Sequence, residues 1–199
     1  MSTLSDFFPA ASGGGGGIVK QEIITSSGTL DLTSLGIADG DLIQLFLVGG
    51  GGGGARYQGG FGGNILSISQ TLGTAGTVTV VIGAGGAAGT GNITNGGDTT
   101  ITGGGLTGTL KAQGGIKPNQ YTTPTSTAGY MQGGLFSYSD DSIGIGGTNA
   151  GYGQGGLAGA SSVAFVGNAN TGNGGGGGTT TSASSNRAGG SGLVIIYYT

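Results

Sequence analysis

The chain has 199 residues, of which 54 are glycine, and only 7% of its residues are charged. The net charge of −3 gives no basic surface of the kind that nucleic-acid binding requires. Because histidine and cysteine are absent, the chain cannot form a Ser–His or Cys–His nucleophile pair, a disulfide, or a zinc site of the usual kind.

The first seventeen residues differ in character from the rest of the chain. Residues 1–12, MSTLSDFFPAAS, lack the basic region and long apolar core of a signal peptide, and no stretch approaches the roughly 18 apolar residues of a membrane span. We expect residues 1–12 to anchor the protein to a larger assembly through Phe7 and Phe8, and residues 13–17 to be a glycine linker. A disordered tail is the alternative.

The remaining residues, 18–199, are expected to form one glycine-rich β domain. Alternating and β-branched stretches predict strands, while no helical periodicity is sustained over three turns. The predicted strands are 18–24, 41–48, 63–72, 77–82, 98–102, 106–113 and 193–199. The stretch 41–48, DLIQLFLV, is apolar on one face and nearly so on the other, which is typical of a central strand. The pattern indicates an all-β fold with a sandwich-like core and no substantial helix.

Long glycine-rich segments separate these strands, at 49–63, 83–97 and most of 114–192. Extended segments without side chains, rising about 3.1 Å per residue, can pack closely and satisfy their backbone groups on neighbouring segments. Ordering 54 glycines costs on the order of 50–100 kcal/mol, which one small sandwich offsets poorly. We therefore expect polyglycine-II-like loops that pack on one another, on a partner subunit, or on both.

One stretch resembles a nucleotide-binding motif. Residues 77–91, TVTVVIGAGGAAGTG, contain the pattern G-x-G-x-x-A at Gly83, Gly85 and Ala88. A dinucleotide-binding fold needs a helix after these glycines and an acidic residue about 20 positions later. Glycines and β-branched residues follow instead, and Asp98 comes too early and begins a β-like run. We interpret the match as chance and expect no cofactor.

The acidic pair Asp140–Asp141 allows three interpretations. It can be a solvated turn, part of a calcium site, or half of a glycosidase dyad. The solvated turn is the interpretation that we adopt, and calcium binding stays open. No metal site is assigned.

Aromatic residues concentrate in the long loop region between residues 116 and 165. They either fill small cores beneath the loops or form a contact surface, for which flat rings near Asn, Gln and Asp suit a saccharide. The candidate receptor-binding residues are Tyr121, Tyr130, Phe136, Tyr138 and Tyr152.

An ordered series of motifs covers roughly residues 20–199. They are LFLVGGGGGG, ARYQGGFGG, NILSISQTL, GTVTVVIGAGGAAG, GGDTTI and GGSGLVIIYYT. This series resembles the glycine-rich domain of bacteriophage tail fibres and related virion proteins. It is more loosely similar to the short tail-tip adhesins of T-even-like phages, whose glycine-rich segments pack as a lattice and present variable loops. The chain departs from those adhesins in its less regular glycine runs and in lacking an evident large attachment domain.

The resemblance implies a non-enzymatic structural protein located in the virion. Its expected partners are other virion proteins, a host surface that includes saccharide, and copies of itself, with a trimer preferred. The alternative within this class is a capsid fibre, decoration protein or tail joint without receptor binding. An ice-binding protein would show a strict glycine period of three, and a depolymerase would need an acidic constellation and a longer chain.

Overall fold

The computed structural model describes residues 19–55, 59–89, 92–118, 152–153, 166–177 and 187–199. Eight strands and one short 3-10 helix, η2, occur within these residues. In chain order they are β1 (Lys20–Ile24), β2 (Gly28–Asp31), η2 (Leu32–Leu35), β3 (Leu42–Val48), β4 (Ile65–Thr71), β5 (Thr77–Val81), β6 (Thr99–Gly103), β7 (Leu110–Ala112) and β8 (Leu193–Tyr198).

The strands form two antiparallel four-stranded sheets, in the orders β1-β8-β3-β4 and β2-β5-β6-β7. The all-β expectation is confirmed, and each of the seven predicted strands is present with ends shifted by a few residues. The pairing of β3 with both β4 and β8 makes it central, as DLIQLFLV indicates. On its second face, however, Gln44 and Phe46 are only half-buried.

The two sheets share one hydrophobic core, which makes the strand region a sandwich. Alternation places every second residue of a strand in this core, as in β5, where Val78 and Val80 are buried while Thr77 and Thr79 are exposed. The buried members are Leu32, Ile37, Ile43, Leu45, Leu47, Leu72, Val78, Val80, Ile101, Ala112, Val194 and Ile196. Side chains from both sheets and from η2 therefore hold the sandwich together.

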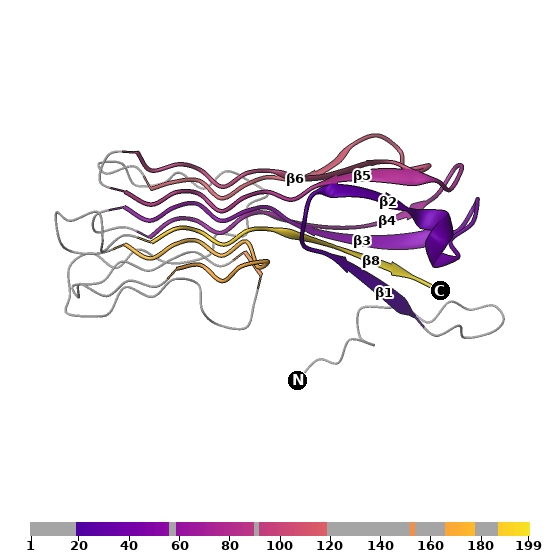
Figure 1. Cartoon of the computed structure of the whole chain (residues 1–199), viewed down its shortest axis with the longest axis horizontal. Helices are drawn as coiled ribbons and strands as arrows, with labels where there is room; N and C mark the ends of the chain where they lie inside the picture. Colours follow the sequence, from indigo (N-terminus) through magenta and orange to yellow (C-terminus); the bar gives the residue numbers. More distant parts are fainter. Residues whose placement is uncertain (1–18, 56–58, 90–91, 119–151, 154–165, 178–186) are drawn as a thin grey trace.

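Beyond the sandwich, the chain continues as a bundle of extended segments that run along the long axis of the molecule (Figure 1). Several segments continue directly from or into a strand: β3 leads into 49–55, β5 into 83–89 and β7 into 113–118, while 187–192 leads into β8. Strand β1 begins and β8 ends at the end of the sandwich that points away from the bundle, where Lys20 pairs with Tyr198. We call this end of the molecule the sandwich end, and we call the far end of the bundle the distal end.

Candidate functional site

The bundle is organised around a central segment, residues 49–54, whose glycines are all buried. Six outer segments surround it. They are 59–64, 83–89, 92–98, 113–118, 172–177 and 187–192.

The central segment donates hydrogen bonds with a period of three residues. Its successive N–H groups bond to 59–64, 92–98 and 187–192, and then the same three segments recur. The bonds are Gly49 to Asn64 (3.0 Å), Gly50 to Gly97 (2.9 Å), Gly51 to Gly190 (2.8 Å), Gly52 to Phe61 (2.8 Å), Gly53 to Thr94 (3.1 Å) and Gly54 to Arg187 (2.9 Å). A three-residue period is that of a polyglycine II helix.

Three carbonyl groups of the central segment accept hydrogen bonds from the other three outer segments. The Gly50 carbonyl accepts the N–H of Gly115 (2.7 Å), the Gly51 carbonyl that of Gly86 (2.7 Å), and the Gly52 carbonyl that of Gly175 (3.0 Å). Hydrogen bonds between neighbouring outer segments then close a ring around the centre. Written from the N–H donor to the carbonyl acceptor, these bonds join Phe61 with Ile116, Gly96 with Gly115, Gly97 with Ala84, Gly189 with Gly86, Gly190 with Asn173, and Gly60 with Gly175. The expectation that the glycine segments pack on one another is confirmed.

This packing explains why the central segment is an unbroken run of glycine. A Cβ atom at any of the six positions would lie closer than 3.0 Å to backbone atoms of a neighbouring segment. At Gly51 the crowding atoms are backbone atoms of Gly172 and Asn173. The clash therefore cannot be relieved by the rotation of a side chain. The glycines are required by close approach of backbones rather than by flexibility.

Outer segments carry side chains where they face away from the centre. Ala84 and Ala87, three residues apart, are exposed. On the neighbouring face, Asn95 Oδ1 accepts the N–H of Lys117 at 2.9 Å, and Asp98 Oδ1 accepts that of Gly114 at 2.9 Å. These two side-chain bonds join segments 92–98 and 113–118, which the Gly96 to Gly115 backbone bond also links.

Asp98 also carries the charge at this face. The Gly114 N–H is the main cause that holds the pKa of the Asp98 carboxyl below its ordinary value. Burial opposes this, and Lys111, with its Nζ 3.1 Å from Asp98 Oδ2, lowers the pKa further. Asp98 is thus a structural carboxylate. The described residues 82–89 that follow β5, where the G-x-G-x-x-A match lies, form no helix.

At the distal end, several described segments of the bundle stop close together. The central segment is described as far as Ala55, and outer segments are described from Asn92, from Arg187 and up to Pro118. Hydrogen bonds from Gly53 to Thr94 and from Gly54 to Arg187 hold the central segment beside two of these ends. The bundle therefore gathers segments that are far apart in sequence into one small area.

Most of the sequence-predicted site residues lie outside the described residues. These are Phe7, Phe8, Tyr121, Tyr130, Phe136 and Tyr138, together with Asp140 and Asp141. The expectations for them stay predictions.

Tyr152 is described, and it lies near the junction between sandwich and bundle. Its ring meets Phe46 of β3 edge-on, with ring centroids 5.3 Å apart, and 40% of the residue is exposed. Beside it, the Gly153 N–H bonds to the Thr171 carbonyl at 2.7 Å. Burial, with a smaller contribution from Tyr152, raises the pKa of Tyr197 on β8. Tyr152 therefore makes a packing contact, and nothing in its sequence neighbourhood signals that position.

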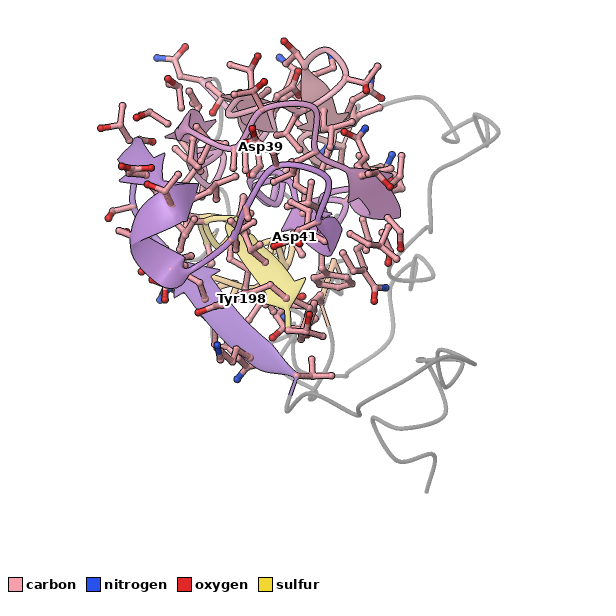
Figure 2. The ribbon with its side chains drawn as sticks, turned by 90° about the vertical axis from the view of Figure 1, so that its right-hand side faces the viewer. Asp39, Asp41 and Tyr198 are labelled. Atoms are coloured by element: carbon pink, nitrogen blue, oxygen red, sulfur yellow. The ribbon has the colours of Figure 1, made fainter. Side chains whose placement is uncertain are left out.

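The sandwich end presents acidic side chains that fix turns (Figure 2). Asp39 Oδ1 accepts the Ala75 N–H at 2.7 Å, and Asp41 Oδ2 accepts the Ala38 N–H at 2.8 Å. Across the described ranges, no group of three or more Asp or Glu side chains is placed to hold a metal ion. In the same part of the chain, no helix has the length and apolar character needed to span a membrane.

A two-sheet sandwich with a hydrogen-bonded polyglycine bundle defines a glycine-rich β domain. The model of the family described as "Glycine-rich domain" matches residues 25–199, which is most of the chain. The chain therefore belongs to the glycine-rich domain family. A comparison with curated proteins finds no match.

Proposed function

We propose that the chain is a structural protein of a phage virion, most specifically a tail-fibre or tail-tip component that contacts the host surface. The observation that supports this proposal is the separation of two ends on one elongated body (Figure 1). Strand β1 begins at the sandwich end, beside the end of β8, whereas described bundle segments such as 49–55 and 113–118 end at the distal end. A body of this shape is suited to holding loops away from its point of attachment.

The bundle supports the loops in a way that flexible glycine linkers cannot. Each central N–H has a backbone acceptor on a neighbouring segment, and each central position is too crowded for a side chain. Binding residues on loops depend on a rigid scaffold for their positions. The sequence between the bundle segments can then change without altering the scaffold, which is the property that a host-contacting protein uses.

The contact surface that we propose is in the aromatic-rich segment between Gly114 and Gly167, with Tyr121, Tyr130, Phe136 and Tyr138 as anchors. Aromatic rings beside amide and carboxylate side chains suit the ring faces and hydroxyls of a saccharide. Each contact is weak, so useful affinity requires several copies on one particle.

Alanine substitutions at these four positions test the role. Adsorption of particles to host cells should fall while particle yield and protein folding stay normal. Tyr198→Ala is the comparison variant: this ring lies at the sandwich end and packs against the core, so its loss reports the effect of lost packing without altering the proposed contact surface. Unchanged adsorption combined with failed assembly would instead support the architectural alternative, a capsid fibre, decoration protein or tail joint.

The N-terminal residues 1–12 are proposed to attach the protein to another virion component. Burying Phe7 and Phe8 in a partner contributes roughly 3–6 kcal/mol before ordering costs. A chain that lacks residues 1–12 should remain folded, as judged by circular dichroism, yet be absent from purified particles. Normal incorporation of the shortened chain would contradict the anchoring role.

A further inference from the structure

Strand β1 lies at an outer edge of its sheet and carries one free edge of backbone. It pairs with β8 on one side only, through the register from Lys20 opposite Tyr198 to Ile24 opposite Val194. Within the described ranges, no other segment bonds to its second side. Unpaired edges of this kind are sites where another strand can add to a sheet.

Two apolar side chains stand exposed along this edge. Val19, directly before β1, is 48% exposed and Ile23 is 51% exposed. They share one face of the strand with Gln21, because side chains alternate, and the opposite face carries Lys20 and Glu22. Proline, one of the devices that keep edge strands unpaired, is absent from β1, and its two charged residues, Lys20 and Glu22, have opposite signs.

The edge is complementary to itself. If a second β1 pairs with it antiparallel around a two-fold axis at Gln21, Lys20 stands opposite Glu22 and Val19 stands opposite Ile23, each twice. A shift of the register by two residues instead places Lys20 opposite Lys20, or Glu22 opposite Glu22, and like charges directly opposite each other are unfavourable. Sequence and exposure thus agree on one register.

We propose that β1 joins two copies of the chain into a symmetric dimer, in which two four-stranded sheets become one continuous sheet. The interface is isologous, so each copy provides the same surface. Because the two β1 strands run antiparallel and the bundle extends from the end of the sheet at which β1 ends, the dimer carries a distal end at each pole. The proposal is independent of host contact, and it differs from the trimer that the fibre resemblance implies.

Sedimentation of the full chain tests the pairing. A five-residue strand makes a small interface, so we expect a dissociation constant on the order of 10–100 μM and a predominant dimer at several times that concentration. A monomer or a trimer under these conditions would overturn the proposal.

Charge-swap variants identify the surface. Glu22→Lys places like charges opposite each other and should weaken dimerisation at least tenfold. The double change Lys20→Glu with Glu22→Lys restores opposite charges and should restore the dimer, and Ile23→Thr should weaken it while keeping a β-branched residue in the strand. Circular dichroism and melting of each monomeric variant report whether the fold is intact. Equal dimerisation by Glu22→Lys and wild type, or failure of the double change to recover it, would exclude this interface.

Discussion

The Thr99 hydroxyl donates a hydrogen bond to the carbonyl oxygen of Val48, with the two oxygen atoms 2.6 Å apart. Val48 ends β3 in one sheet and Thr99 begins β6 in the other, and both are fully buried. Thr99 Oγ1 also accepts the N–H of Gly83 at 2.9 Å, at the start of an outer bundle segment. One hydroxyl therefore ties the two sheets together where strands change into polyglycine segments.

Removing this hydroxyl should destabilise the domain. Thr99→Val keeps the shape of the side chain but leaves the Val48 carbonyl and the Gly83 N–H without this partner, so we expect a loss of about 1–3 kcal/mol in the free energy of unfolding. Thr99→Ser keeps the hydroxyl and loses a methyl group, which should cost about 1 kcal/mol or less. Urea unfolding of both variants measures the difference. A valine variant as stable as the serine variant would show that the hydroxyl has no net effect.

The central segment should not tolerate a methyl group. Gly51→Ala places a Cβ atom against the backbone of Gly172 and Asn173, and we expect destabilisation of about 3 kcal/mol or more, because backbone segments must separate. Gly76→Ala is the matched control, since its Cβ would meet nothing within 4 Å and its backbone is outside the left-handed region. This control should change stability by less than about 1 kcal/mol. Comparable melting temperatures for the two variants would contradict the close-packed bundle.

The sequence predicts the strands well because their burial follows alternation, as Val78 and Val80 show. It misses β2, whose four residues, GTLD, contain a single apolar side chain, Leu30. It also misses the short helix η2, which depends on a local cap: Asp31 Oδ1 accepts the Thr33 N–H at 3.0 Å. Short elements of this kind leave too few residues for a period to be recognised.

The arrangement of the bundle was predictable in kind but not in detail. An unbroken glycine run at 49–54 indicates a segment enclosed on every side, whereas side chains at every third position, such as Ala84 and Ala87, indicate an outer one. That signal is present in the sequence. The order of the ring is not, because glycine backbones carry no side chains that distinguish one neighbour from another. The position of Tyr152 depends on Phe46, more than a hundred residues earlier, and no local pattern reveals it.

Acidification should weaken the bundle through Asp98. Its pKa in the folded protein is below the ordinary value of 3.8, so its contribution to stability is complete above that value and is lost as the pH falls through the folded pKa. Asp98→Asn removes the ion pair with Lys111, and its melting temperature should fall less steeply than that of the wild type below pH 3.8. Thermal melts between about pH 2 and pH 6 measure the two slopes. Parallel curves would show that Asp98 contributes nothing to the acid response.

Variants of Tyr152 distinguish its packing contact with Phe46 from the receptor contact that the sequence suggests. Its ring lies edge-on to Phe46, an arrangement that contributes about 0.5–1.5 kcal/mol beyond area burial. Tyr152→Ala should therefore lower the free energy of unfolding by about 1 kcal/mol or more, whereas Tyr152→Phe keeps the ring and should leave it nearly unchanged. Chemical denaturation of the isolated protein gives both values, and adsorption is measured separately on particles that carry each variant. An alanine variant with wild-type stability but reduced adsorption would show that the ring serves contact with the host rather than packing on β3.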